Sequence, residues 1–328
     1  MASGWLNAFS NDGYPVDALV TPLKPYVARA DSAQIFNQIP RMQRLGIKQQ
    51  LVISAYWPTT TGAARGDHPP GQINEQWGFK DWTAWLNFVT DNVKLAQKKG
   101  IASTLQFDIY NEPDEFSGFW PYDRAANKYP FPEHFYETWK KAYLRIRAMQ
   151  PNAIIVGPSY KDHSIDRVLA FMDYAKANNV MPDIISFHFP TDIVGEVNRI
   201  RLKCDQLGIA RRPIQVNEYV YRYFGTPTVD EEYAGKTAWL IAQLERAKVD
   251  AGVHAIWVSP AIQYGQLSGV VGPKPGYNKL GDWWVYKNYA DISGKILDTT
   301  PGKNVDIIAG GNNAEKSIHM LLGTNPGT

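Results

Sequence analysis

Two glutamates in this sequence follow short apolar stretches, and each is preceded by an asparagine. Glu112 follows the stretch 101–109, and Pro113 comes directly after it. Glu218 follows the stretch 213–216. Short apolar runs of this kind are typical of buried strands, and proline cannot continue a central strand. We therefore expect both glutamates at the C-terminal ends of strands.

Two carboxylates at two strand ends of one barrel can converge on a single bond. Hydrolysis of a glycosidic bond needs such a pair: one acid protonates the leaving oxygen, and one carboxylate attacks the sugar or activates water. The pattern of Glu112 and Glu218 therefore indicates glycoside hydrolysis.

The elements that must position these residues alternate along the chain. Apolar segments predict eight strands, at 4–8, 26–30, 47–54, 101–109, 153–157, 183–189, 213–218 and 252–258. Amphipathic segments predict eight helices, at 15–23, 33–45, 80–100, 133–149, 164–178, 191–208, 231–249 and 282–290. Strict alternation favours parallel pairing, and eight units favour a closed (β/α)8 barrel, or TIM barrel, with chemistry at the C-terminal ends of its strands. An open doubly wound sheet is the alternative, but no glycine-rich phosphate turn follows an early strand.

The last part of the chain has a different pattern. Residues 305–309 and 317–322 alternate as strands do, and the segment 310–313 between them has turn composition. We therefore divide the chain into a catalytic barrel at 1–293 and a small C-terminal β-hairpin at 294–328. The hairpin is interpreted as a possible remnant of an accessory β-sandwich.

Aromatic residues are concentrated in long segments that follow predicted strands. They make up 13% of the chain, which contains 11 tryptophans and 18 tyrosines. Flat rings can stack on sugar faces, and packing inside the protein is the alternative. The candidates for carbohydrate binding in these segments are Tyr56, Trp57, Trp120 and Tyr221.

The motif at residues 108–114, Asp-Ile-Tyr-Asn-Glu-Pro-Asp, closely resembles the strand-four signature of glycoside hydrolase family 39, the β-xylosidase and α-L-iduronidase family. The chain as a whole resembles a clan A glycoside hydrolase over residues 4–290. This resemblance implies that Glu112 is the general acid/base and Glu218 the nucleophile. It also implies retention of anomeric configuration, with carboxyl groups about 5–5.5 Å apart.

Further roles follow from the same resemblance. Asn111 matches the amide that binds the sugar 2-hydroxyl, and Trp257 matches the tryptophan that forms the floor of the sugar site. Glu112 must be protonated at rest, so burial and the charge of Glu218 should raise its pKa. Arg29, at the end of the second predicted strand, is placed to keep Glu218 ionised. His188, on the sixth strand, could orient a carboxylate, bind a hydroxyl or simply be part of the barrel wall.

Composition excludes several other classes of function. The formal net charge is +2 with no long basic run, so nucleic acid is not an expected partner. Cys204, the single cysteine, excludes an internal disulfide and is expected to be buried. No apolar run could span a membrane, and the start lacks the features of a signal peptide. We expect no metal and no cofactor, and a soluble, secreted or periplasmic protein whose signal peptide is absent from this sequence.

The long aromatic segments suit a cleft for a polymer, which favours an endo-acting enzyme on β-linked polysaccharide or oligosaccharide. An exo-acting, β-xylosidase-like glycosidase is the alternative. A carbohydrate-binding barrel that has lost catalysis is an alternative from another class. An unrelated barrel enzyme such as an aldolase would want a lysine at a strand end, and Lys24 and Lys48 do not end predicted strands.

Overall fold

The computed structural model describes residues 2–9, 13–53, 82–114, 132–161, 165–219, 234–255, 270–272 and 278–325. Within these ranges, no helix combines the length and the apolar character needed to cross a membrane. Cys204 is buried on a helix, as expected from the sequence.

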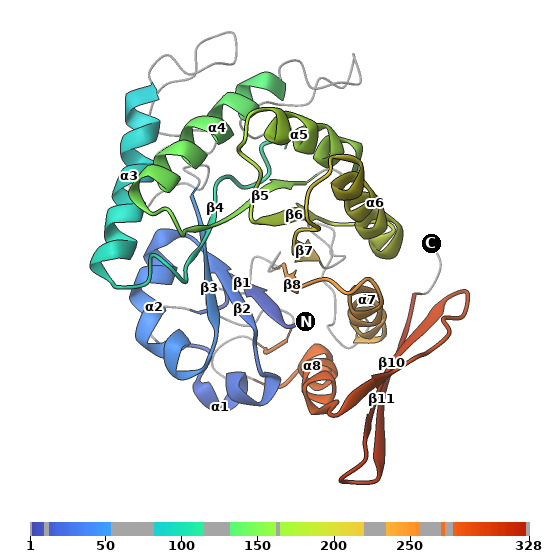
Figure 1. Ribbon diagram of the computed structural model, residues 1–328. Helices are drawn as coiled ribbons and strands as arrows, with labels where there is room; N and C mark the ends of the chain where they lie inside the picture. The colour runs from blue at the N-terminus through green and yellow to red at the C-terminus, as the bar shows by residue number, and fades with distance from the viewer. Residues whose placement is uncertain are drawn as a thin grey trace.

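Eight strands close into a barrel in chain order, and every neighbouring pair is parallel (Figure 1). The strands are β1 (Gly4–Leu6), β2 (Val27–Ala30), β3 (Lys48–Val52), β4 (Gln106–Asp108), β5 (Ile154–Tyr160), β6 (Ile184–His188), β7 (Ile214–Tyr219) and β8 (Ala251–His254). The helices outside them are α1 (Asp17–Val20), α2 (Ser32–Arg44), α3 (Trp82–Lys98), α4 (Pro132–Met149), α5 (Ile165–Ala177), α6 (Ile193–Gln206), α7 (Ala234–Arg246) and α8 (Gly281–Asp291). The predicted (β/α)8 barrel is confirmed.

The fourth strand is shorter than its apolar sequence predicts. Only Gln106–Asp108 pair in the barrel, whereas residues 101–105 form a turn closed by a hydrogen bond from the amide of Leu105 to the carbonyl of Ile101 (2.8 Å). The three apolar side chains of this turn, Ile101, Ala102 and Leu105, are buried. The apolar run therefore indicates that these residues are buried, not that they pair as a strand. Periodicity alone does not distinguish a buried strand from another buried segment.

The space between barrel and helices is filled by large side chains that fit against small residues. Trp139 of α4 is fully buried against Gly157 of β5, where an added Cβ would lie 2.2 Å from the indole ring. Its indole N–H donates to the carbonyl of Val180 (2.8 Å). Trp139 therefore packs α4 closely against β5.

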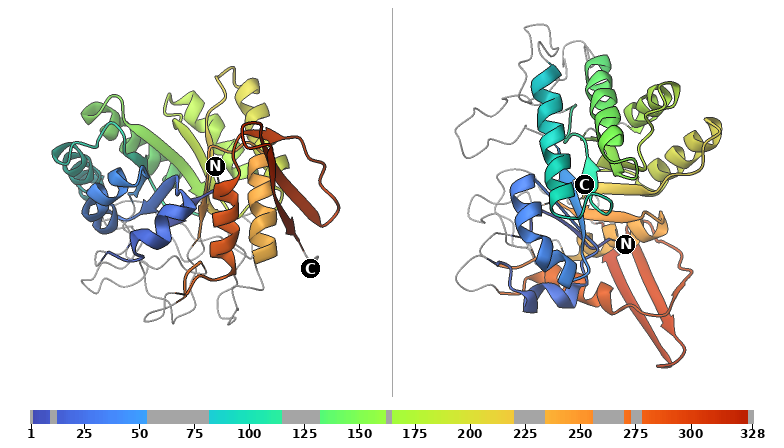
Figure 2. Two further views of the ribbon diagram at one scale, coloured as in Figure 1. Left: turned by 90° about the horizontal axis from the view of Figure 1, so that it is seen from below. Right: turned by 60° about the vertical axis from the view of Figure 1, so that its left-hand side comes forward.

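A three-stranded antiparallel sheet follows the barrel, in the order β11-β10-β9. Its strands are β9 (Lys295–Leu297), β10 (Val305–Asn312) and β11 (Ser317–Thr324). The sheet lies beside α7 and α8 (Figures 1 and 2). The predicted hairpin is present, but the turn lies at 313–316 instead of 310–313, and the short strand β9 was not predicted. The division at residue 293 and the origin of the sheet in a β-sandwich stay predictions.

Candidate active site

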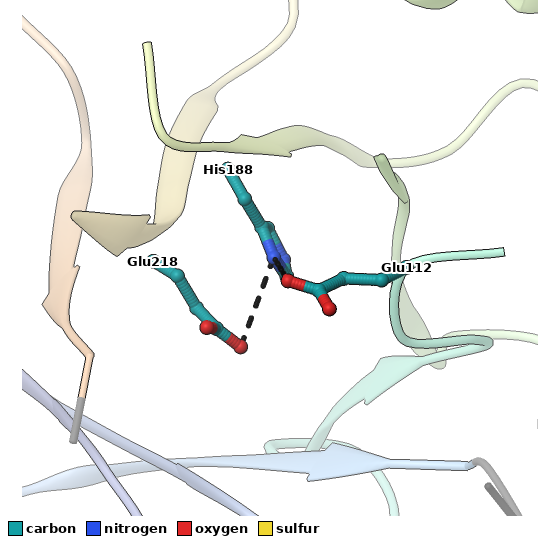
Figure 3. Close-up of side chains that lie close together, drawn as sticks. All are labelled: Glu112, His188 and Glu218. Carbon is teal, nitrogen blue, oxygen red and sulfur yellow. Dashed lines mark hydrogen bonds and ion pairs between the residues drawn. The ribbon is translucent and has the colours of Figure 1, made fainter. Parts of the chain in front are cut away.

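Glu112, His188 and Glu218 lie together at the C-terminal ends of β4, β6 and β7. Figure 3 shows both carboxylates directed toward the His188 ring. One carboxylate oxygen from each glutamate and one imidazole nitrogen all lie within 4.8 Å of one another. The three side chains are at most 2% exposed. The fold therefore brings the two predicted glutamates together, with a histidine between them.

The backbone at Glu112 is held in an unusual conformation. Its φ angle is +46°, in the left-handed region that non-glycine residues rarely adopt. The amide of Glu112 donates to the carbonyl of Ser159 on β5 (3.0 Å), which ties the residue to the neighbouring strand. Left-handed residues of this kind cost on the order of 1–3 kcal/mol and cluster at functional sites.

An irregularity in β7 directs Glu218 into the site. Phe187 pairs with Val216, but the next residue of β6, His188, pairs with Glu218, so β7 contains one extra residue at this point. In a regular strand, consecutive side chains point to opposite faces. Here Asn217 donates to Asp108 and Glu218 accepts from Arg29, so both side chains enter the same buried polar cluster, because a bulge changes the direction of the side chains that follow it.

Arg29 is the central cation of this cluster. Its Nη1 donates to Glu218 Oε1 at 2.9 Å and its Nη2 to Asn111 Oδ1 at 2.8 Å. Its Nε donates to Asp108 Oδ2, also at 2.8 Å. Arg29 is 1% exposed, so its charge acts on Glu218 with little screening by solvent. The predicted contact between Arg29 and Glu218 is present.

The two glutamates have different electrostatic surroundings. Burial raises the pKa of Glu112 to about 7, and the nearby Lys161 and Arg29 oppose this shift while Asp114 adds to it. Glu218, unlike Glu112, accepts a hydrogen bond directly from the Arg29 guanidinium. Near neutral pH, one carboxyl can therefore carry a proton while the other is held as an anion.

His188 links the two carboxylates. Its Nδ1 lies 3.0 Å from Glu112 Oε1 and 3.7 Å from Glu218 Oε1. Burial lowers the pKa of His188 to about 4, against the opposing influence of Glu218. The ring is therefore neutral at pH 7 and carries a single N–H, so Nδ1 can either accept or donate a hydrogen bond, depending on the tautomer, without adding charge to the site.

Besides Oδ1 of Asn217, two buried polar atoms at the site lack hydrogen-bond partners within the described part of the chain. They are Nδ2 of Asn111 and Nε2 of His188, and both are buried. Because Asn111 Oδ1 accepts from Arg29, its NH2 group is free to donate elsewhere. Buried polar groups left unsatisfied are costly, so both atoms are suited to contact a polar ligand.

The predicted site residues have different outcomes. Asn111, Arg29 and His188 lie in the same cluster as the two glutamates. The remaining candidates, Tyr56, Trp57, Trp120, Tyr221 and Trp257, lie outside the described residues and stay predictions. The same holds for the long aromatic segments on which the expectation of a polymer cleft depended.

Three cluster residues were not predicted as parts of the site: Asp108, Ser159 and Asn217. Asp108 accepts from Arg29, from Ser159 Oγ at 2.8 Å and from Asn217 Nδ2 at 3.3 Å. A signal was available for one of them, since Asp108 is a charged residue within an apolar strand and requires a buried partner. Ser159 and Asn217 carry no comparable signal.

Glu112, His188 and Glu218 are also residue types that bind divalent metals. Two features favour acid–base chemistry over a metal site. The oxygen of Glu218 nearest the histidine already accepts a hydrogen bond from Arg29, and a cation placed there would face the guanidinium charge. The expectation of no bound metal stays a prediction.

No protein-family model matches the chain. Among curated proteins, it is 24% identical over 347 aligned positions to 3-O-alpha-D-galactosyl-alpha-L-arabinofuranosidase from Bifidobacterium longum subsp. longum. The alignment covers 89% of this chain but 29% of that protein, so the chain spans less than a third of the length of the relative it matches.

Solved structures match the fold over almost the whole chain. N2152 from Neocallimastix frontalis superposes with a TM-score of 0.78 at 24% identity, covering 98% of this chain and 76% of that one. A family 39 β-xylosidase from Caulobacter crescentus superposes with a TM-score of 0.68 at 16% identity, covering 95% and 75%. The chain therefore has the barrel fold found in family 39 glycoside hydrolases.

Proposed function

We propose that this protein is a retaining glycoside hydrolase that cleaves β-glycosidic bonds of a polysaccharide or oligosaccharide by double displacement. The observation that carries the proposal is the unequal environment of two adjacent carboxyl groups. Burial raises the pKa of Glu112 to about 7, whereas Glu218 accepts a hydrogen bond from Arg29. Such a pair provides an acid and an anionic nucleophile within one site.

In the first step, Glu218 attacks the anomeric carbon while Glu112 gives its proton to the leaving oxygen. The glycosidic bond breaks, and a glycosyl ester forms on Glu218. In the second step, Glu112, now ionised, removes a proton from water, which attacks the anomeric carbon and releases Glu218. The neutral His188, within 3.0 Å of Glu112, suits this cycle because it can hydrogen-bond to both forms of that carboxyl group.

The spacing of the carboxylates supports retention of configuration. One oxygen of Glu112 and one of Glu218 lie within 4.8 Å of each other. Retaining enzymes place these groups about 5–5.5 Å apart, whereas inverting enzymes need about 6.5–9.5 Å for a water molecule between them. We assign to Asn111 the binding of the sugar 2-hydroxyl; its NH2 group, which has no partner in the described part of the chain, supports this role.

A second substrate class has specific support. The curated relative is named for cleavage of an α-L-arabinofuranoside, and a retaining site of the same design could act on that linkage. The expectation of endo-acting cleavage depends on the composition of segments outside the described residues. The experiment below therefore tests exo-acting cleavage as well.

The decisive experiment is hydrolysis of β-linked polysaccharides, aryl β-glycosides and aryl α-L-arabinofuranosides by wild type, Glu218→Ala and Glu112→Ala. We expect Glu218→Ala to be inactive on every substrate. Glu112→Ala should retain activity only on aryl glycosides with good leaving groups, because these do not need protonation. Glu137→Ala, which changes an exposed glutamate of α4, is the matched control and should behave as wild type.

Product analysis completes the test. NMR of the first product formed should show the anomeric configuration of the substrate, and inversion would contradict the mechanism. If wild type binds oligosaccharides but cleaves none, the protein is a binding barrel without catalysis. If both glutamate variants match wild type on every cleaved substrate, the assignment of the two carboxylates is wrong.

A further inference from the structure

The buried polar cluster around the two glutamates contains residues other than Arg29 that the mechanism above does not use. It consists of Arg29 on β2, Asp108 on β4, Ser159 on β5, Ser186 on β6 and Asn217 on β7, all at most 1% exposed. Five strands thus contribute one polar side chain each to the barrel interior. Burying so many polar groups costs free energy unless they form hydrogen bonds with one another.

Asp108 is the residue on which this cluster converges. Its Oδ1 accepts from the Ser159 hydroxyl at 2.8 Å. Its Oδ2 accepts from Arg29 Nε at 2.8 Å and from Asn217 Nδ2 at 3.3 Å. The Ser159 hydroxyl is in turn 2.7 Å from that of Ser186. Both carboxylate oxygens are therefore engaged by protein groups, so Asp108 does not need to touch a substrate.

Each of the three guanidinium nitrogens of Arg29 donates a hydrogen bond. The Nε edge faces Asp108, while Nη1 faces Glu218 and Nη2 faces Asn111. The guanidinium is planar and rigid, so fixing the Nε edge also fixes where Nη1 and Nη2 point. Asp108 therefore sets the orientation of Arg29 from the opposite side of the guanidinium. That orientation directs Arg29 toward Glu218, the proposed nucleophile, and Asn111, the proposed hydroxyl-binding amide.

We propose that Asp108 is a positioning residue that orients Arg29 and, through it, Glu218 and Asn111. The inference rests on the proposed function, because it assigns Asp108 a role in that same reaction. Asp108 also sets the charge of the cluster. Arg29 carries one positive charge shared between two carboxylates, so Glu218 remains a more basic nucleophile than it would be with Arg29 as its sole neighbour.

Two substitutions separate orientation from charge. Asp108→Ala removes the acceptor for Arg29 Nε, and we expect kcat to fall about 100-fold with KM changed less than about threefold, because misaligned groups act mainly on the transition state. Asp108→Asn keeps an acceptor for Arg29 and a donor for the Ser159 oxygen, and it should recover most of this loss. Asp205→Asn, at an exposed ion pair with Arg211, is the matched control.

The pH profile gives a readout that a purely structural role would not change. Within the described part of the chain, the charged or titratable groups near Glu218 are Arg29, Asp108, Glu112 and His188. Removing the negative charge of Asp108 makes Glu218 easier to ionise, so the acid limb of kcat/KM in Asp108→Asn should move to lower pH. An unchanged acid limb, together with equal kcat in both Asp108 variants, would overturn the proposal.

A measurement that needs no substrate distinguishes failure of this inference from failure of the proposed function. The Nε–H of Arg29, assigned in the nitrogen–proton NMR spectrum by its absence in Arg29→Lys, should exchange slowly with water in wild type and in Asp108→Asn. In Asp108→Ala it should exchange rapidly. If no glycoside is cleaved but the Nε–H still exchanges slowly in wild type and rapidly in Asp108→Ala, the proposed function fails. The role of Asp108 in orienting Arg29 then stands. Slow exchange in Asp108→Ala would overturn it; should that variant not fold, the acid limb of kcat/KM in Asp108→Asn decides, and an unchanged limb overturns the proposal.

Discussion

Nη1 of Arg29 lies 2.9 Å from Oε1 of Glu218, and neither side chain is more than 1% exposed. The contact joins the end of β2 to the end of β7, so the barrel itself holds the cation against the carboxylate. An opposite charge within about 4–6 Å favours the ionised form of a carboxyl group. In the proposed mechanism, this pairing suits Glu218 to be the nucleophile and leaves Glu112 to carry the proton.

Replacing Arg29 by lysine should remove most of the activity. A lysine ammonium cannot reproduce the fork that reaches Asp108, Glu218 and Asn111 together. We expect kcat to fall on the order of 100-fold, as on loss of one preorganised donor. The acid limb of the kcat/KM profile should move to higher pH, because Glu218 loses cationic support.

The matched control for this substitution is Arg44→Lys. Arg44 also forms an ion pair, with Asp17, but its side chain is 62% exposed. Exposed pairs contribute little, so activity and unfolding should match wild type. If Arg29→Lys keeps kcat within about threefold of wild type, the guanidinium fork is not needed for catalysis.

The alkaline limb of the activity profile should report Glu112. Burial raises the pKa of this carboxyl to about 7, so kcat/KM should fall above about pH 7 as the proton donor is lost. Asp114 contributes to the raised pKa, so Asp114→Asn should move the limb to lower pH. The profiles of wild type, Asp114→Asn and the exposed control Asp205→Asn test this prediction, which fails if all three coincide.

Glu112 should also make the protein less stable at alkaline pH. Its pKa is raised on folding, so its contribution to stability is fully present below the unfolded value of 4.5 and is lost as pH rises through about 7. Glu112→Gln keeps the shape and cannot ionise. Its stability relative to wild type should therefore grow by about 2 kcal/mol between pH 5 and pH 8.

Denaturant unfolding of both proteins at several pH values measures this difference. Glu137→Gln, at an exposed position, should show no comparable trend with pH. A constant difference between Glu112→Gln and wild type across the range would mean that the Glu112 carboxyl has similar pKa values in the folded and unfolded chains.

The alternation of apolar strand-like and amphipathic helix-like segments was enough to predict the barrel. The repeated Asn-Glu pair at two predicted strand ends was enough to predict that Glu112 and Glu218 lie at one face of it. The hydrogen-bond partners of Asp108 could not be predicted, because a lone charge in an apolar strand does not reveal which of several strands supplies its partner. The bulge that directs Glu218 into the site depends on pairing between β6 and β7, which is not visible in either strand alone. Strand β9 has three residues and pairs only because β10 is present.

The packing of α4 against β5 should not tolerate a methyl group at Gly157. An added Cβ would lie 2.2 Å from the ring of Trp139, which is fully buried and cannot move aside freely. Overpacking of this kind costs about 1–3 kcal/mol. Gly157→Ala should lower the unfolding midpoint accordingly. At Gly302 the nearest atom to an added Cβ lies 3.6 Å away, so Gly302→Ala is the control and should unfold close to wild type.

The C-terminal sheet should depend on Asp306 for its attachment to the barrel. Asp306 lies on β10 at 1% exposure, where it accepts hydrogen bonds from Arg246 and Gln243 of α7. Removing one partner of a buried pair leaves the other unsatisfied, but Arg246 is a quarter exposed and can be rehydrated. We therefore expect Asp306→Ala to lower the free energy of unfolding by about 1–3 kcal/mol. Proteases should cleave the sheet of this variant before the barrel.

Asp298→Ala, at an exposed position nearby, is the control. Equal protease resistance of both variants and wild type would show that apolar packing against α7 holds the sheet without this ion pair.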